Sequence, residues 1–165
     1  MTAKDGIIFL DFDGVLNSLR GYRKAREEGR QTGDEYGTAF DCDCVAALRK
    51  IVDATGVSIV VTSSWRYILD KDDIRKMWSD RQLPGLVYSV TPTDLLIDPE
   101  ERCKRGIEIN AWLMAHGASV NYVILDDDED FLPYQLPHLV HTNPETGLTA
   151  ADADRALQMI NHILN

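Results

Sequence analysis

The chain has 165 residues, of which 44% are hydrophobic and 27% charged, and its formal net charge is -10. We therefore expect one domain over residues 1–165, without the surplus of lysine and arginine that stable, non-specific nucleic-acid binding requires. Because there is no secretory signal, no stretch long enough to cross a bilayer and no disulfide framework, we expect a cytoplasmic protein without a membrane partner.

Short apolar segments alternate with amphipathic ones along the chain. Segments rich in β-branched residues predict strands at 6–11, 57–62, 86–90 and 122–126, with a weaker fifth at 138–142. Apolar residues at helical spacing predict helices at 43–55, 72–81 and 106–116, and a last helix that starts at Thr149. This alternation predicts an α/β fold with a central parallel sheet of about five strands and helices on both faces.

Residues 17–40 break this rhythm, since they are polar, punctuated by glycine and short of apolar periodicity. Such a length is unusual for a loop inside a compact domain, so the segment is either disordered or a functional flap. It carries a basic cluster, namely Arg20, Arg23, Lys24, Arg26 and Arg30. These side chains either gather a polyanion or pair with Glu27 and Glu28, and we favour the pairing.

Acidic and hydroxyl side chains follow three of the predicted strands. Asp11 and Asp13 follow the first, Thr62 and Ser63 follow the second, and an acidic run at 126–130 follows the fourth. Ligands bind beyond the carboxyl ends of the strands in an open parallel sheet, so these groups are expected to share one crevice. Mg²⁺ prefers oxygen ligands, and phosphoryl transfer needs a cation and hydrogen-bond donors around the phosphate. A carboxylate can also attack phosphorus while a second acid protonates the leaving oxygen.

The residues at these strand ends resemble the signatures of the haloacid dehalogenase-like (HAD) superfamily. Residues 7–15, IIFLDFDGV, resemble the first signature, and residues 59–62, ending in Thr62, resemble the second. Lys104 and Arg105 occupy the place of the basic third signature, and residues 123–130 match the acidic fourth. The segments FLDFDGVLN, TSSWR and VILDDD are similar to the sequences of a small branch of the superfamily, which is related to phosphatase domains of RNA-repair proteins.

This resemblance implies a three-layer Rossmann-like fold with a small flap at about 17–40 and no large cap domain. It implies that Asp11 is the nucleophile and a metal ligand, and that Asp13 is the acid/base and a metal ligand through its carbonyl oxygen. Asp126 would complete a Mg²⁺ site, supported by Asp127 or by Asp130.

The same resemblance implies groups that bind the substrate phosphate. Thr62 or Ser63 would hold a phosphate oxygen, and Lys104 or Arg105 would supply the positive charge; we favour Lys104 and keep both. Arg66 is a further candidate for gripping the phosphate. Trp65, beside it, either stacks on a base or packs beneath the following helix.

We therefore predict a Mg²⁺-dependent phosphatase that hydrolyses a phosphomonoester through an aspartyl-phosphate intermediate. Its substrate would be a small molecule such as a nucleotide, a nucleic-acid end or a phosphoprotein, because an open site accepts bulky groups. The alternatives are a receiver-like phospho-accepting module and a catalytically inactive binding domain. A receiver typically carries its phospho-acceptor after the third strand, where Thr91 and Pro92 stand here, so the sequence favours the enzyme.

Overall fold

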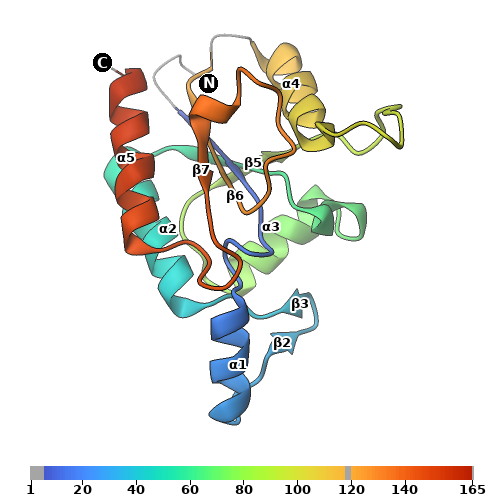
Figure 1. The fold of residues 1–165 in the computed structure, drawn as a ribbon. Coiled ribbons are helices and arrows are strands. Elements are labelled where there is room, and N and C mark those ends of the chain that lie inside the picture. The colour runs from blue at the N-terminus through green and yellow to red at the C-terminus, as the bar shows by residue number, and fades with distance from the viewer. Residues whose placement is uncertain (1–5, 118–119, 165) are drawn as a thin grey trace.

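The computed structural model describes residues 6–117 and 120–164, and its centre is a five-stranded parallel sheet (Figure 1). The strands lie in the order β5-β4-β1-β6-β7, and every neighbouring pair is parallel. Their bounds are β1 Ile7–Leu10, β4 Ser58–Val61, β5 Val87–Val90, β6 Tyr122–Asp126 and β7 Leu139–His141. All five predicted strands are therefore present, including the weakest.

The four predicted helices are also present, with their ends set by local signals in the sequence. They are α2 Cys42–Thr55, α3 Lys71–Asp80, α4 Lys104–His116 and α5 Ala150–Leu164. Asp41 caps the start of α2, and Gly56 ends it with a φ of 67°, a left-handed conformation that suits glycine. In the described part of the chain, no helix combines the length and apolar character needed to cross a membrane.

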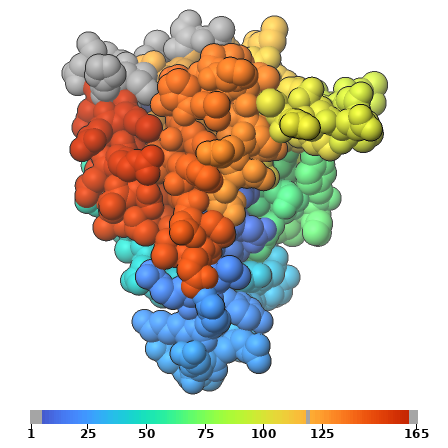
Figure 2. Space-filling view, in the orientation of Figure 1, coloured from blue at the N-terminus to red at the C-terminus, as the bar shows by residue number. Residues whose placement is uncertain are grey.

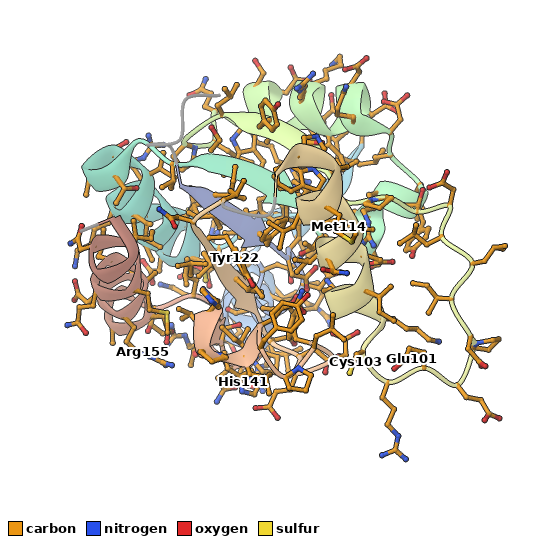
Figure 3. All side chains as sticks on the ribbon, turned by 90° about the horizontal axis from the view of Figure 1, so that it is seen from above. Glu101, Cys103, Met114, Tyr122, His141 and Arg155 are labelled. Atoms are coloured by element: carbon orange, nitrogen blue, oxygen red, sulfur yellow. The ribbon has the colours of Figure 1, made fainter. Side chains whose placement is uncertain are left out.

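Side chains alternate across β1 and divide the core into two layers. Ile8 and Leu10 pack in a cluster with residues of α2, α3 and α5. Ile7 and Phe9 point to the opposite face, where they pack with residues of α4. Figure 3 shows α4 on one side of the sheet and α2 with α5 on the other. Because both faces are covered, the strands are apolar throughout, as expected for a parallel sheet in a Rossmann-like fold.

Residues 17–40, which we call the flap, form an ordered unit beside the carboxyl ends of the strands (Figure 1). They hold α1 Leu19–Glu27 and a small antiparallel hairpin of β2 Gly33–Asp34 and β3 Gly37–Thr38. Figure 2 shows the flap as a narrow lobe that projects from the body of the molecule. The sequence did not predict α1, since Ala25 is its one buried residue and leaves no apolar stripe.

A short 3₁₀ helix, η1 Ser64–Tyr67, follows β4, and a second, η2 Leu136–His138, precedes β7. The first of these matters for the site, because it turns the chain sharply after Thr62 and Ser63. It therefore keeps both hydroxyl residues at the edge of the sheet, next to the end of β1, which pairs with β4.

Candidate active site

Three carboxylates converge where β1 and β6 end. Asp11 follows β1, Asp126 is the last residue of β6, and Asp127 follows it. Each offers an oxygen within 4.8 Å of the other two. The side chains come together because β1 and β6 are hydrogen-bonded neighbours in register, with Leu10 opposite Leu125. The predicted meeting of the acids at one edge of the sheet is thus what the structure contains.

The carboxylates lie in a poorly hydrated position that disfavours their charged forms. Asp11 is 5% exposed and Asp126 is fully buried. Burial raises the pKa of Asp126 to about 8, and the neighbouring charge of Asp11 adds to the shift while Arg105 opposes it. Burial likewise raises the pKa of Asp11 and of Asp127. A metal cation bound between these side chains would favour their charged forms and offset the cost of their burial.

Arg105 is the cation of the cluster, and the preference for Lys104 is corrected here. Arg105 Nη1 lies 3.0 Å from Asp11 Oδ1 and 3.3 Å from Asp126 Oδ2. The Arg105 amide also donates to Asp130 Oδ2 at 3.2 Å, which anchors the first turn of α4. Lys104 is exposed, and its Nζ donates to the carbonyl oxygen of Pro99 at 2.7 Å. The two residues are neighbours on a helix, so their side chains leave it about 100° apart.

The acidic run after β6 divides between two tasks. Asp127 joins Asp11 and Asp126 in the cluster. Asp130 instead faces Arg105, with its Oδ1 3.9 Å from the Arg105 Nε and its backbone carbonyl accepting from Gly106. Of the two candidates for supporting the metal site, the structure therefore brings Asp127 to the other acids.

The hydroxyl residues after β4 also lie at this edge. The Ser63 hydroxyl hydrogen-bonds the Asp11 carboxylate, and this bond opposes the rise in the pKa of Asp11 that burial causes. Thr62 is fully buried, and its Oγ1 has no hydrogen-bond partner among the described residues. A buried hydroxyl is rarely left unpaired, so Thr62 is available for an oxygen-bearing ligand.

Arg66 does not reach the cluster, and its predicted grip on a phosphate is corrected. Its guanidinium is buried, donates to the carbonyl oxygens of Thr62 and Ser63, and pairs with Glu108 of α4. The positive charge of Arg66 is thus already balanced by Glu108, beneath the loop that carries Thr62 and Ser63. Glu108 was missed by sequence reasoning, because a single acid on the buried face of a helix gives no signal of its partner.

Asp13 stands apart from the three clustered carboxylates. Its side chain is exposed and accepts two hydrogen bonds, from Asn17 Nδ2 at 2.7 Å and from Trp65 Nε1 at 3.0 Å. Neither partner was predicted, although Asn17 stands four residues after Asp13, at the end of the segment FLDFDGVLN that is similar to the RNA-repair branch. Whether the Asp13 carbonyl oxygen binds a metal stays a prediction.

The turn that joins residues 11–13 to the flap requires glycine at position 14. Gly14 has a φ of 72°, and a Cβ there would lie 2.3 Å from Asp127 Oδ2. The Gly14 carbonyl oxygen accepts from Thr142 Oγ1 at 2.9 Å, which ties the turn to the segment after β7. Glycine thus lets the backbone of the loop after β1 approach Asp127, which follows β6.

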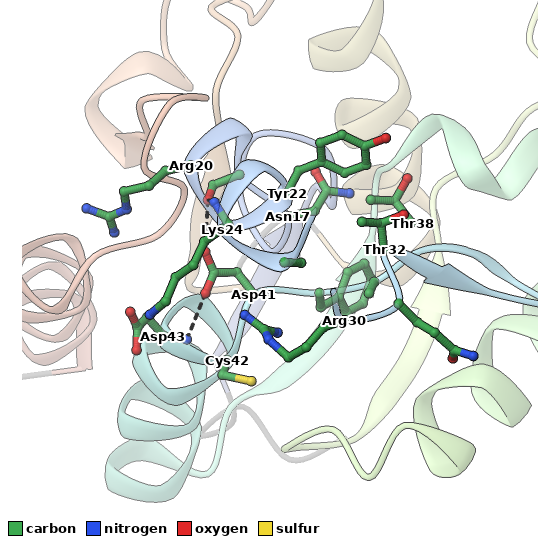
Figure 4. A pocket seen from close by; sticks show the side chains of 16 residues that line it. Asn17, Arg20, Tyr22, Lys24, Arg30, Thr32, Thr38, Asp41, Cys42 and Asp43 are labelled. Atoms are coloured by element: carbon green, nitrogen blue, oxygen red, sulfur yellow. Dashed lines mark hydrogen bonds between the residues drawn. The ribbon is translucent and has the colours of Figure 1, made fainter. Parts of the chain in front are cut away.

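A cavity of about 310 Å³ lies between α1 and the start of α2, and Asn17 is part of its lining (Figure 4). Its walls carry both charges, and the charged residues are Arg20, Lys24, Arg30, Asp41 and Asp43. Arg30 pairs with Glu28 at 2.7 Å, as the pairing interpretation of the basic cluster expected, whereas Arg23 pairs with Glu145 outside the flap. The mixed lining gives the cavity no strong preference for a polyanion.

Comparison with known proteins agrees with the arrangement of these residues. A family model described as the HAD domain in Swiss Army Knife RNA repair proteins matches residues 7–153. This range includes all five strands and every residue of the carboxylate cluster. Neither the curated proteins nor the solved structures contain a match to the chain. The match covers most of the sequence, so the chain belongs to the family of HAD domains found in Swiss Army Knife RNA repair proteins.

Proposed function

We propose that the chain is a Mg²⁺-dependent phosphatase that hydrolyses a phosphomonoester through an aspartyl-phosphate on Asp11. Family membership indicates a phosphatase-type hydrolase in general. The observation that carries the finer proposal is the cluster of Asp11, Asp126 and Asp127, within 4.8 Å of one another and facing Arg105. Membership and the Asp11-x-Asp13 spacing favour this hydrolase over a receiver-like module.

The cluster has the donors that a hard divalent cation requires. Three carboxylates face one guanidinium, and Asp126 Oδ2, though 3.3 Å from Arg105, is buried without an aligned hydrogen bond to any residue that the structure describes. Asp11, Asp126 and Asp127 would hold Mg²⁺ through oxygen atoms, the ligands that this ion prefers. Bound Mg²⁺ would offset the negative charge of the phosphoryl oxygens and of the attacking carboxylate.

In the first step a carboxylate oxygen of Asp11 bonds to phosphorus while the bond from phosphorus to the leaving oxygen breaks. Asp13 gives its proton to that leaving oxygen, so the alcohol departs neutral. In the second step Asp13 takes a proton from water, whose oxygen bonds to phosphorus as the bond to Asp11 breaks. Inorganic phosphate leaves, and both aspartates return to their starting states.

The remaining side chains would bind the transferred phosphoryl group. Arg105 presents its guanidinium beside Asp11 and would bind phosphoryl oxygens as charge develops on them. The unpaired Thr62 hydroxyl and the Ser63 hydroxyl beside Asp11 would donate hydrogen bonds to the same oxygens. The flap is small, so we propose a nucleotide or a nucleic-acid end as the substrate, in keeping with the RNA-repair description of the family.

The test is hydrolysis of 4-nitrophenyl phosphate by the full chain in the presence of Mg²⁺. We expect Asp11→Asn to abolish turnover, because an amide neither attacks phosphorus nor carries the charge that holds the cation. We expect EDTA to stop the wild-type reaction and added Mg²⁺ to restore it. A radiolabelled phosphoryl group should remain on the wild-type protein after an acid quench and be missing from Asp11→Asn.

Asp128→Asn is the matched control. Asp128 lies in the same acidic run, but its side chain is exposed and accepts from the Glu129 amide at 2.8 Å. The substitution removes the same charge from the same loop, and we expect turnover to stay near the wild-type value. Full activity of Asp11→Asn would reject the covalent mechanism, and activity in EDTA would reject the metal.

A further inference from the structure

The Asp13 carboxylate is held from two sides by hydrogen-bond donors that belong to different segments. Asn17 Nδ2 donates to Oδ1 at 2.7 Å, and Trp65 Nε1 donates to Oδ2 at 3.0 Å. Neither donor contacts Asp11, Asp126 or Asp127 through any hydrogen bond found among the described residues. Two donors on the two oxygens fix the position of the carboxyl group and also the rotation of its plane.

Asn17 is itself held in place by the turn that it closes. Its Oδ1 accepts from the Gly14 amide at 3.2 Å, and residues 13 and 17 form an isolated bridge. The side chain is half-buried, whereas Asp13, to which it donates, is exposed. Asn17 therefore has its two side-chain groups occupied, one by the backbone of the turn and one by the carboxylate.

Trp65 is fixed by contacts around its ring. The ring packs edge-on against Phe12 at 5.5 Å between centroids and lies 5.7 Å from Phe40 at the end of the flap. The Arg81 guanidinium lies 5.6 Å from the ring centroid, and a Cβ on Gly37 would lie 3.0 Å from Trp65 Cη2. The indole has little freedom to rotate, so its N–H has a set direction. Trp65 thus packs against Phe12 and the flap and makes a polar contact with Asp13, while stacking of its ring on a base stays a prediction.

We propose that Trp65 and Asn17 are positioning residues that aim the Asp13 carboxyl group at the leaving oxygen of the substrate. The inference rests on the proposed function, because it needs Asp13 to be the acid/base. Donation of a proton to the leaving oxygen requires the acid within hydrogen-bonding reach and correctly oriented. A carboxyl group on an exposed turn would otherwise rotate freely between several orientations.

This role predicts an effect that depends on the leaving group. A good leaving group, such as 4-nitrophenolate, departs without a proton, whereas an alkoxide needs one. Trp65→Phe keeps an aromatic ring against Phe12 and Phe40 and removes the N–H together with part of the indole ring system. We expect it to lower kcat/KM about tenfold for benzyl phosphate and less than about threefold for 4-nitrophenyl phosphate, within the range of general acid catalysis. Asn17→Ala should shift the ratio of the two values in the same direction.

Trp78→Phe is the matched control, because Trp78 also packs near Phe12 and also uses its indole N–H, which donates to the Pro84 carbonyl oxygen at 3.0 Å. It should leave the ratio between the two substrates at the wild-type value, whatever it does to stability. Equal losses on both substrates in Trp65→Phe, or no loss on either, would overturn the positioning role.

Asp13→Ala separates this inference from the proposed function beneath it. If Asp13→Ala discriminates strongly between the substrates while Trp65→Phe does not, only the positioning role is wrong. If Asp13→Ala treats both substrates as the wild type does, Asp13 is not the acid and both proposals fall.

A second readout does not depend on turnover. The chain has three tryptophans, and each gives one indole N–H signal in an ¹⁵N–¹H spectrum. We expect Asp13→Ala to move the Trp65 signal and to speed its exchange with water, and to leave the signals of Trp78 and Trp112 in place. A Trp65 signal that stays unchanged would overturn the hydrogen bond on which the inference depends.

Discussion

Binding of Mg²⁺ to the carboxylate cluster should release a proton at neutral pH, and the structure gives the sign and size of this effect. Burial and the charge of Asp11 raise the pKa of Asp126 to about 8 from its usual value of 3.8. At about pH 7 the metal-free protein therefore holds a proton on Asp126 in most molecules. A metal ion binds the carboxylate, so this proton must leave.

The affinity for Mg²⁺ should consequently rise with pH and level off above the pKa. Between about pH 6 and about pH 8 we expect the Kd to fall by up to about tenfold per unit. The metal-free protein should show the opposite trend in stability. The folded state binds the proton more tightly than the unfolded chain, so its stability is highest below the unfolded pKa and falls as pH rises towards about 8. The slope is at most about 1.4 kcal/mol per pH unit for one proton.

Isothermal titration calorimetry of the full chain with MgCl₂ measures both quantities. Titrations in two buffers with different ionisation enthalpies give the number of protons released, which we expect to be about one at about pH 7. Asp126→Asn removes the group with the most strongly raised pKa and should lower the number of protons released. A Kd that is constant from about pH 6 to about pH 8, with no release of protons, would refute the reasoning.

Four further substitutions test separate contacts. Arg105→Ala should lower kcat/KM on 4-nitrophenyl phosphate by at least about a hundredfold, whereas Lys104→Ala should stay within about twofold; similar losses in both variants would restore Lys104 as a partner. Glu108→Ala leaves the buried Arg66 charge unpaired, so urea denaturation should show a loss of about 3–5 kcal/mol, and a loss below about 1 would contradict the structural role of the pair. Gly14→Ala forces a Cβ against Asp127 at a positive φ, so calorimetry should show weaker Mg²⁺ binding and urea a lower stability; wild-type values would argue against this close approach.

The sheet and the acidic edge were predictable because they follow from local patterns. Strands buried on both faces are continuous apolar runs, and β1, β4 and β6 each end where that run meets a polar residue. Parallel strands bring their carboxyl ends to one edge, so residues such as Asp11 and Asp126 were assigned to one site without knowledge of their distance.

The cation was harder to predict, because it depends on how a helix is rotated. Lys104 and Arg105 are adjacent and have the same charge, and only the contacts of α4 decide between them. The Asp130 carboxylate accepts from the Arg105 amide and the Asp130 carbonyl accepts from Gly106, which fixes the first turn of the helix and turns Arg105 inward. Arg105 and Asp130 are 25 positions apart in the sequence, and no periodic pattern reveals contacts over that separation.

The orientation of the Arg66 side chain was equally hard to predict from the sequence, and its contacts show why Arg66 matters to the site. The Thr62 carbonyl oxygen accepts from Arg66 and, at 3.3 Å, from Arg105, so two arginines meet at one backbone oxygen. Arg66 pairs with Glu108, which stands one helical turn after Arg105 on α4. One helix therefore supplies the cation of the carboxylate cluster and supports the loop that carries the Thr62 hydroxyl. A shift of α4 would displace both together, so the charge that faces the phosphate and the hydroxyl that would bind it keep their relative positions.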